Sequence, residues 1–525
     1  MVTRSHPPIG AMRGSAAGGV SARAMAQVMY AIVTMIVAVI LLLLRPDSVG
    51  EALALVVVST ALVFAMALFP PGRDHRDFGD VLFVVSLPFL LGFGVETLLS
   101  LTGFVPVNAA GGMATDPLQF KFDQVSLSAL TLAVISWGAL FVGYRLRIGE
   151  AISTRLPNPS LARVDTGSIR LAAVVFAVVG WSARIAAMAQ NGVVDPSSGF
   201  ESINALSTLL VWLSFLTTVA STLALFGVFF RRADAAGVTL AVGLVSAELV
   251  AGLVTGSRTL MFTPPVEMAA MAYLTGRYHL RLRHLLVIPA VLLIIGVTDT
   301  YRNPGYIIPS TVYASDTGAR VQLAIDESVD QGPVQLVWRG ALNVAVRYQG
   351  LYSVAQVLRV GPPSDLSYGT SYVLAVPAAL IPRILWSDKP FPTRGVDFGV
   401  QYLGLPESAG VSIAPTWVGD LMLNVPLFMV PIGMGLLGVL LRAFCGYGLG
   451  AREGTTFAVL VYPMLLPILL QSDSWISGAV WEVTQALAVL VVAFALMRSV
   501  GSPSGERASS GYTTVGGHGR GRVAR

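Results

Sequence analysis

Eight basic residues lie between residues 301 and 418, in a segment that the expected topology places on the outer side. An arginine side chain presents a planar fork of N–H donors that matches phosphate oxygens, and it keeps its charge at working pH. The segment therefore suits an anionic, phosphate-bearing ligand. The alternative is that these cations are solvated and offset by acids of the same segment. The basic residues are Arg302, Arg320, Arg339, Arg347, Arg359, Arg383, Lys389 and Arg394, and the acids include Asp316, Asp326, Glu327 and Asp330.

Arg258 follows Gly256 and Ser257 at the expected junction between two apolar blocks. A charge inside or beside hydrocarbon is costly unless it is paired or functional, so Arg258 is a candidate site residue. The alternative is an interfacial arginine whose long side chain reaches the lipid phosphates.

The run 381–390, IPRILWSDKP, contains two prolines and Trp386. This composition predicts a rigid interfacial turn that directs Arg383 and Lys389 toward the membrane surface. An ordinary aromatic membrane anchor would have the same composition.

Thr416, Gly419, Asp420 and Asn424 lie at the expected entrance of a late apolar block. Asp420 and Asn424 are four residues apart, so they share one face of a helix. A carboxylate there would be able to take a proton from a sugar hydroxyl. The alternative is an acid at a helix start, stabilised by the helix dipole.

Histidine and cysteine usage limits the chemistry. The expected topology places all five histidines on the inner side, so a base on the outer side would have to be a carboxylate such as Asp420, unless the leaving group needs none. The single cysteine, Cys445, predicts no disulfide or metal site. The histidines are His6, His75, His279, His284 and His518.

In this order and spacing the residues resemble the bacterial O-antigen polymerase (Wzy) family and its oligosaccharide repeat unit polymerase relatives. The resemblance covers about 252–442. It rests on Gly256-Ser257-Arg258, a long loop with an Arg-containing helix, Ile381-Pro382-Arg383 before Trp386 and Lys389-Pro390, and Gly419-Asp420 with Asn424. The chain departs from that family in having Asp420 where Glu is commoner, and Asn424-Val425-Pro426 where an aromatic residue and Gly are commoner.

The resemblance implies an enzyme that joins polyprenyl-diphosphate-linked oligosaccharide units on the outer face of the bacterial cytoplasmic membrane, with no cofactor or metal. Arg258, Arg347 and Arg383 would then stabilise the charge that develops on the diphosphate. Asp420 would orient the acceptor or act as a base. Arg302, Arg339, Lys389, Thr416 and Asn424 would bind substrate. The implied partners are lipid-linked oligosaccharides, membrane lipids, a flippase and a chain-length regulator, without nucleic acid.

Three other activities remain open on the sequence. A glycan ligase would use similar chemistry with another acceptor. A lipid-linked glycan flippase or transporter would place charges at mid-membrane, where Glu248, Glu267 and Arg184 are the candidates. A glycosyltransferase using a lipid-phosphate sugar would carry an acidic pair in its first outer loop, but Asp47 and Glu51 are four residues apart.

These residues must be positioned by membrane-spanning helices. The chain is 54% hydrophobic and 12% charged, and its apolar residues come in blocks of about 20, the length that crosses a hydrocarbon layer. The prediction is an all-α polytopic integral membrane protein with about twelve transmembrane helices. The predicted spans are 25–44, 51–69, 81–101, 125–144, 169–189, 209–230, 236–255, 260–274, 284–299, 420–441, 456–470 and 480–497.

Arginines flank alternate blocks, which predicts cytoplasmic termini. The predicted organisation is a cytoplasmic segment (1–24), nine spans (25–300), a large extracytoplasmic loop (301–418), three spans (419–497) and a disordered cytoplasmic tail (498–525). Within the loop, 333–360 has a helical apolar pattern, and 371–381 is too short to cross, so it either re-enters the membrane or lies against the bundle.

Overall fold

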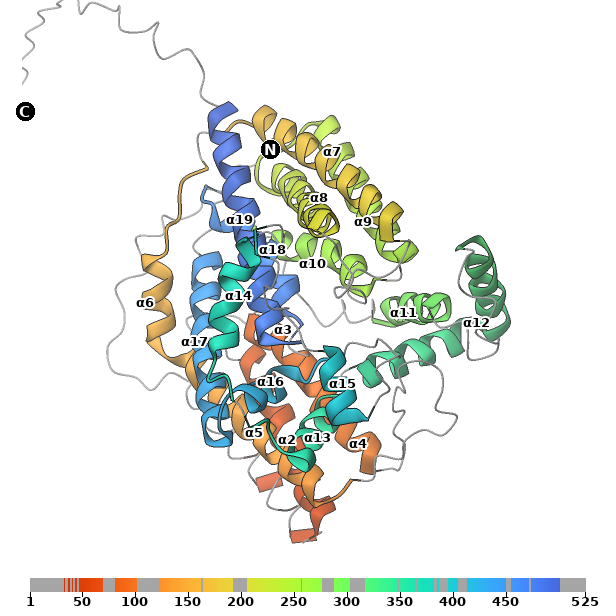
Figure 1. Cartoon of the computed structure of the whole chain (residues 1–525), viewed down its shortest axis with the longest axis vertical. Helices are drawn as coiled ribbons and strands as arrows, with labels where there is room; N and C mark the ends of the chain where they lie inside the picture. The colour runs from red at the N-terminus through yellow and green to blue at the C-terminus, as the bar shows by residue number, and fades with distance from the viewer. Residues whose placement is uncertain are drawn as a thin grey trace, which may run out of the picture.

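The protein is described here from a computed structural model, in which the described residues are helical apart from turns, loops and one isolated antiparallel bridge between Ser160 and Thr456 (Figure 1). The structure describes residues 47–68, 81–101, 122–161, 164–191, 205–255, 257–275, 288–302, 317–347, 349–364, 366–381, 395–404, 413–449, 455–471 and 474–500, with isolated positions at 33–44 and 385–386.

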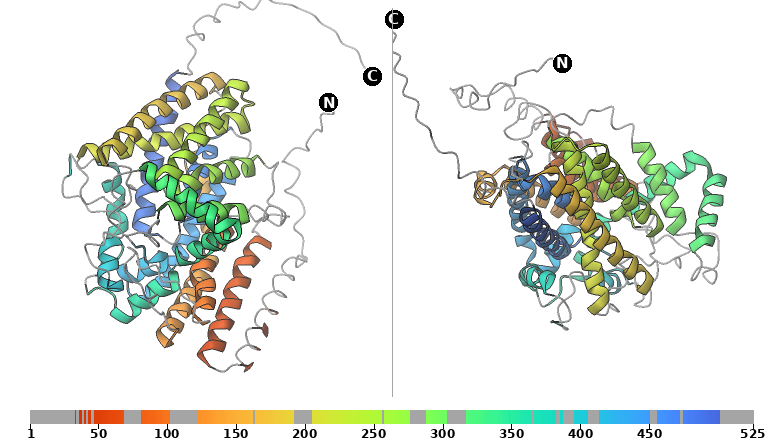
Figure 2. Two further views of the ribbon diagram at one scale, coloured as in Figure 1. Left: turned by 90° about the vertical axis from the view of Figure 1, so that its right-hand side faces the viewer. Right: turned by 90° about the horizontal axis from the view of Figure 1, so that it is seen from above.

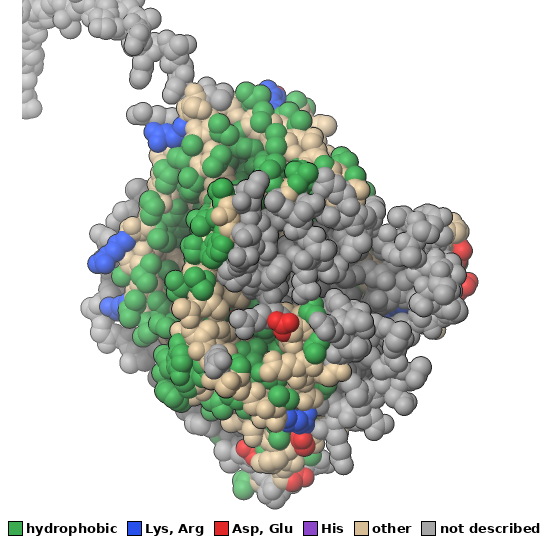
Figure 3. All heavy atoms as spheres, in the orientation of Figure 1, with side chains coloured by type: hydrophobic (Ala, Val, Ile, Leu, Met, Phe, Trp, Pro, Cys, Tyr) green, Lys and Arg blue, Asp and Glu red, His purple; other side chains and the backbone are tan. Residues whose placement is uncertain are grey.

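Seven helices among the described residues are long and apolar enough to cross a membrane. Hydrophobic side chains cover much of the described face in Figure 3, with most basic side chains near its edge. This confirms the helical class with several apolar spans but not the count of twelve. The seven stretches are Val84–Leu101, Gln124–Arg145, Thr166–Ala189, Trp212–Phe230, Ala235–Leu253, Leu427–Gly448 and Ile476–Ser499.

The first stretch is divided among three helical elements. These are α3 (Val81–Phe89), a π-helical turn η2 (Leu90–Val95) and α4 (Glu96–Leu101). The others are α5 (Gln124–Arg145), α7 (Thr166–Asn191), α8 (Ala205–Phe230), α9 (Ala235–Thr255), α17 (Val430–Leu449) and α19 (Ile476–Val500), with a short amphipathic helix α6 (Arg147–Arg155) after α5.

Four other predicted spans are helices that contain none of these seven stretches. They are α2 (Ser48–Leu68), α10 (Arg258–Leu274), α11 (Ile288–Arg302) and α18 (Ala458–Leu469). α18 has 12 residues, about 18 Å of helix, whereas a hydrocarbon core is about 30 Å thick. The predicted span 25–44 lies largely outside the described residues.

The described residues of the segment predicted as a large loop are mainly helical. They form α12 (Thr317–Arg347), α13 (Gly350–Val360), α14 (Thr370–Leu380) and α15 (Gly395–Leu403), and α16 (Thr416–Asn424) begins at the end of the segment. The helical pattern predicted over 333–360 corresponds to two helices, because α12 ends at Arg347 and α13 begins at Gly350. Its predicted start is close, since α12 bends at Gly332, whose φ of 73° is accessible to glycine, just before Pro333.

The predicted span 420–441 is also wrong in its bounds. Asp420 belongs to α16, which ends at Asn424, and the extended Val425 and Pro426 separate it from the apolar stretch that begins at Leu427. Proline lacks the N–H that a continuous helix would need at that point, so α16 and α17 are separate elements.

Close helix packing depends on glycine at two contacts. α5 packs on α17, where a Cβ at Gly143 would collide with the carbonyl of Gly435, and a Cβ at Gly438 with that of Leu140. α11 packs on α12 in the same way through Gly296. Small residues let membrane helices approach through their backbones.

Hydrogen bonds between connecting segments show which helix ends lie together. We call the end of the bundle where they meet the basic end. Arg231, after α8, donates to the Leu161 carbonyl at 2.7 Å, and Tyr447 donates to the Pro157 carbonyl at 2.9 Å. The ends of α5, α8 and α17 and the starts of α7, α9 and α18 therefore lie at one end of the bundle.

The opposite end carries α13 and α16. Arg359, in the last turn of α13, pairs with Asp123, the N-cap of α5, at 2.6 Å. Glu96 of α4 accepts hydrogen bonds from Leu351 N at 2.8 Å and Tyr352 N at 3.1 Å, and so caps α13. This places the first turn of α13 against α4 rather than in solvent.

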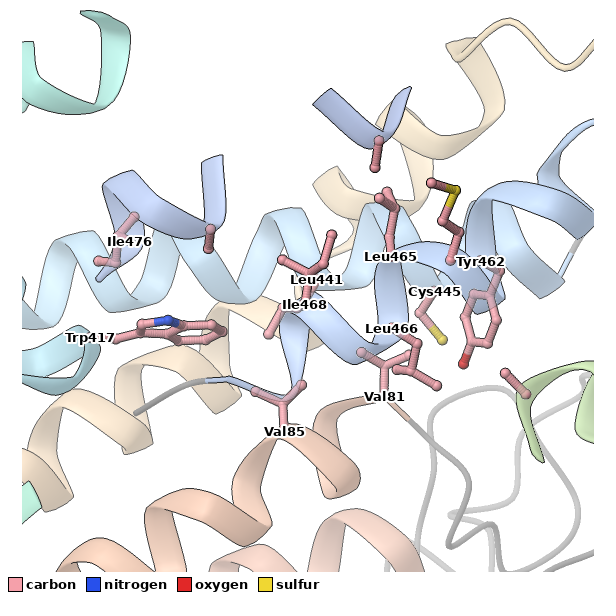
Figure 4. Close-up of a cluster of buried hydrophobic side chains, with 14 of the residues drawn as sticks. Val81, Val85, Trp417, Leu441, Cys445, Tyr462, Leu465, Leu466, Ile468 and Ile476 are labelled. Carbon is pink, nitrogen blue, oxygen red and sulfur yellow. The ribbon is translucent and has the colours of Figure 1, made fainter. Parts of the chain in front are cut away.

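Residues from five helices build the core near α18. Cys445 of α17 lies among Tyr462 and Leu466 of α18 and Val81 of α3, all buried (Figure 4). The same cluster extends to Trp417 of α16 and Ile476 of α19. The core thus joins α16, the element that carries the late polar residues, to the membrane-spanning helices.

Candidate functional site

Asp420 joins α16 to the start of α19. Its Oδ2 accepts the Ile476 N–H at 2.8 Å, and its side chain is 1% exposed. The free N–H groups at a helix start carry partial positive charge, so they stabilise a carboxylate. The alternative considered for Asp420, an acid at a helix start, is therefore realised, but on α19 rather than on its own helix.

Asn424 lies beside Asp420 on the same face of α16, as the four-residue spacing predicts. Its Nδ2 donates to Asp420 Oδ1 at 2.9 Å. Its Oδ1 accepts from Ser367 Oγ at 2.5 Å and from Ser371 Oγ at 2.7 Å, and its backbone carbonyl accepts the Tyr368 N–H at 2.8 Å. Asn424 thus fixes the segment that precedes α14 and the first turn of that helix.

That segment, 367–372, carries five hydroxyl-bearing side chains in six residues; we call it the hydroxyl segment. Its members are Ser367, Tyr368, Thr370, Ser371 and Tyr372. Tyr368 is 69% exposed and has a φ of 48°, whereas Tyr372 donates to the Asp420 carbonyl at 3.4 Å. The sequence analysis missed these residues, although the density of hydroxyl groups in SYGTSY was a usable signal.

The apolar helix α14 continues from the hydroxyl segment and packs along α19. Near its end, the Ala379 carbonyl accepts the Trp212 Nε1–H of α8 at 3.1 Å. α14 therefore contacts the bundle at both α19 and α8, which is compatible with both placements predicted for 371–381.

Burial raises the pKa of Asp420 to about 7, although hydrogen bonds from Ile476, Tyr372, Ser477 and Asn424 act in the opposite direction. α16 lies outside the seven apolar stretches. Because both carboxylate oxygens accept hydrogen bonds from the protein, Asp420 is placed to hold Asn424 and α19 in position rather than to meet a ligand directly.

The structure leaves most of the predicted cations untested. Arg258 begins α10, Arg302 ends α11 and Arg347 ends α12, but the side chains of all three lie outside the described residues. Arg383 and Lys389 lie wholly outside them.

Two predicted substrate-binding residues have partners within the protein. Arg339 pairs with Glu327 at 2.6 Å across the bend of α12. For this residue the structure shows the alternative stated above, in which a basic residue of the segment is offset by an acid of the same segment. Thr416 is buried at the start of α16, has a φ of 69°, and accepts the Gly419 N–H at 3.5 Å. The structure therefore brings Thr416, Asp420 and Asn424 together on α16 and places Arg339 in an ion pair on α12.

A second buried polar cluster lies in the helices α7 to α10. Arg184 pairs with Glu248 at 2.7 Å, and their side chains are 8% and 4% exposed. Glu267 is fully buried and contacts Ser221 and Thr222, each at 3.1 Å. The sequence identified Arg184, Glu248 and Glu267 as charged residues within apolar blocks. It did not identify their partners, which lie on different helices.

The apolar helices and their packing define a helical protein embedded in a membrane. Residues 185–452, slightly more than half of the chain, match the family described as "Domain of unknown function (DUF8712)". The chain belongs to this family. No curated protein and no solved structure matches it. The matched range contains Asp420, Asn424 and the hydroxyl segment, together with Glu248 and Glu267.

Proposed function

We propose that this protein is a polysaccharide polymerase of the bacterial cytoplasmic membrane, which joins polyprenyl-diphosphate-linked oligosaccharide units on the outer face. In this proposal a hydroxyl of one unit attacks the anomeric carbon of another, and the polyprenyl diphosphate leaves. The observation that carries the proposal is the hydroxyl segment, held by Asn424 beside the apolar helix α14.

The geometry suits a ligand that is part sugar and part lipid. Hydroxyl and amide groups exchange hydrogen bonds with sugar hydroxyls, and the exposed ring of Tyr368 offers a face for a sugar ring. The neighbouring α14 presents exposed apolar side chains, Val373 at 70% and Leu374 at 43%. Asp420 supports this surface by fixing Asn424, so we assign it a positioning role.

The leaving diphosphate requires cations, and the proposal keeps Arg258, Arg347 and Arg383 for that role, with Arg302 and Lys389 in substrate binding. Replacing Arg258 or Arg383 with Lys keeps the charge but removes the planar fork, so polymer formation should fall strongly in both variants. Normal polymer from well-expressed Lys variants of both residues would end this assignment.

The proposal needs the hydroxyl segment on the outside and the basic end in the cytoplasm, with both termini cytoplasmic. In a Cys445→Ser background, Val329→Cys on α12 should react with an impermeant thiol reagent in intact spheroplasts. Leu156→Cys at the basic end, which is also exposed, should react only after lysis. The reverse pattern would place the hydroxyl segment in the cytoplasm.

The direct test uses the purified full chain in lipid, with polyprenyl-diphosphate oligosaccharide as the only substrate and excess chelator present. Longer lipid-linked chains are expected. Tyr368→Ala should reduce their formation about tenfold, equivalent to roughly 1.4 kcal/mol. Trp338→Ala removes an equally exposed ring from α12 and should have no effect. Equal losses in both variants, or activity that requires added magnesium, would contradict the proposal.

A lipid-linked glycan transporter is the second candidate, and the buried Arg184–Glu248 pair favours it, since charges inside the membrane often mark transport pathways. The two functions differ in what cells without the gene accumulate. Loss of a polymerase leaves single units on the outer face, whereas loss of a transporter leaves them on the inner face.

A further inference from the structure

The contact of Glu267 with Ser221 and Thr222 lies at the middle of the apolar bundle. Ser221 and Thr222 are central in Trp212–Phe230, with nine residues before Ser221 and eight after Thr222 in this stretch. Glu267 of α10 contacts both of them from the neighbouring helix. α8 packs on both α9 and α10 (Figures 1 and 2). Because α8 is long enough to cross the membrane, its contacts with Glu267 place the Glu267 carboxyl group at the membrane centre.

The charges of this cluster do not balance. Arg184 offers one positive charge and pairs with Glu248, and its guanidinium also lies over the Trp181 ring at 5.0 Å. Glu248 in turn interacts electrostatically with Glu267. With both glutamates ionised, one negative charge would remain inside hydrocarbon, where an uncompensated charge costs several kcal/mol.

The hydroxyl groups around Glu267 are arranged to accept a hydrogen bond from its protonated side chain. Ser221 Oγ and Thr222 Oγ1 both lie 2.9 Å from the Thr218 carbonyl and 3.1 Å from a Glu267 oxygen. Each hydroxyl has one hydrogen, so the two hydroxyls together supply donors for only two of these four contacts. A proton on Glu267 supplies a third, because Glu267 can donate to one hydroxyl while that hydroxyl donates to Thr218.

Glu248 adds an independent sign of ligand binding. Its Oε2 holds Arg184, but its Oε1 is buried and has no hydrogen-bond partner among the described residues. Buried carboxylate oxygens are rarely left without a donor. An acceptor is therefore available in the same cluster for a proton that leaves Glu267.

The other elements packed on α8 and α10 place no further cation beside Glu267 in any contact that the structure describes. α19, which packs on α8, carries Glu482 and, in its last turn, Arg498, whose guanidinium lies over the Phe494 ring. α18, which packs on α10, has Tyr462 as its one titratable residue, and that ring stacks on Phe444 of α17. α11 meets α10 at Met261, six residues before Glu267, through Thr298.

We propose that Glu267, with Ser221, Thr222 and Glu248, forms a binding site for one exchangeable proton at the centre of the membrane. The site is distinct from the hydroxyl segment and does not depend on the polymerase proposal. The proton neutralises the cluster when bound, and the buried Glu248 Oε1 offers an alternative acceptor in the same cluster. Binding and release would change the charge buried between α8, α9 and α10 by one unit.

The test is infrared spectroscopy of the purified full chain in lipid at neutral pH, with hydrogen–deuterium exchange. The difference between the wild-type and Glu267→Gln spectra should contain a carboxylic-acid C=O band that shifts in D₂O, since acids outside the cluster contribute equally to both spectra. The same difference measured in an Asp420→Asn background is the control and should keep the band, because Asp420 lies on α16, outside the cluster. A difference spectrum without this band would overturn the proposal. If adding sodium removed the wild-type band, the site would bind a metal cation in place of the proton, and this result would also overturn the proposal.

If Glu267→Gln fails to fold, Ser221→Ala combined with Thr222→Val keeps the proposal testable. These changes remove the two acceptors of the Glu267 proton but leave Glu267 itself, so the band should move to the frequency of a more weakly hydrogen-bonded acid. An unmoved band would show that its carboxylic acid lies elsewhere, which contradicts the proposal.

Discussion

Asp420 and Glu248 are both almost completely buried, but the protein compensates them by different means. Asp420 accepts hydrogen bonds from the Ile476 N–H and from Asn424, so backbone and amide dipoles surround it. Glu248 is paired with the full charge of Arg184. A carboxylate held by neutral donors can lose its charge and keep its surroundings, whereas one held by a cation cannot. The comparison therefore separates a positioning site from an electrostatic one.

The largest expected effect comes from breaking the ion pair. Arg184→Ala leaves Glu248 buried without its cation, which should cost about 3–5 kcal/mol or prevent folding. Thermal unfolding in detergent and the yield of monodisperse protein would measure it. Replacing both members, Arg184→Gln with Glu248→Gln, should recover most of the loss. If the double variant is as unstable as Arg184→Ala, the pair does not act through its charges.

Removing the Asp420 carboxylate should have a smaller effect. Asp420→Ala leaves the Ile476 N–H and the Asn424 amide without their acceptor, at a cost of about 1–3 kcal/mol. Glu96→Ala is the matched comparison, because Glu96 caps α13 through two backbone N–H groups in the same way. Similar losses of Tm are expected. A neutral Asp420→Ala variant would contradict the role of this carboxylate in holding α16 to α19.

The Asp420 site should also make stability depend on pH. Burial raises the pKa of Asp420 from 3.8 to about 7, so the folded state binds this proton more tightly than the unfolded state. The contribution of Asp420 to stability is then fully present below about pH 4 and is lost as the pH rises to about 7. Wild-type Tm should fall over this interval relative to Asp420→Asn. Parallel curves for the two proteins would show that Asp420 does not titrate there.

The exposed pair Asp123–Arg359 should give the smallest effect. Hydrogen bonds from Ser126 and Arg359 outweigh the opposing effect of partial burial and lower the pKa of Asp123. Because the two side chains are 44% and 29% exposed, Arg359→Gln should cost only about 0–1 kcal/mol, and less at high salt. A loss as large as that of Asp420→Ala would mean that Arg359 does more than pair with Asp123.

Local patterns in the chain were sufficient for the helical class and for several contacts. Seven of the twelve apolar blocks predicted as spans are long and apolar enough to cross, and the four-residue spacing predicted that Asp420 and Asn424 share a face. The sequence did not predict that α18 has only 12 residues or that α15 and a separate α16 follow the helical patterns of 333–360 and 371–381. Composition shows that a block is apolar but not whether protein or lipid will cover it. The apolar surface of α13 is buried by protein.

The sequence by itself determined which residues carry charge, where proline and glycine interrupt helices, and that the chain needs an apolar environment. Only the tertiary structure decided the partners: Asp420 with the start of α19, Glu96 with α13, and Glu267 with Ser221 and Thr222. The physical reason is that periodicity acts over a few residues of one helix. The donors that neutralise a buried carboxylate come from helices tens to hundreds of residues away, and their positions are set by how the helices pack.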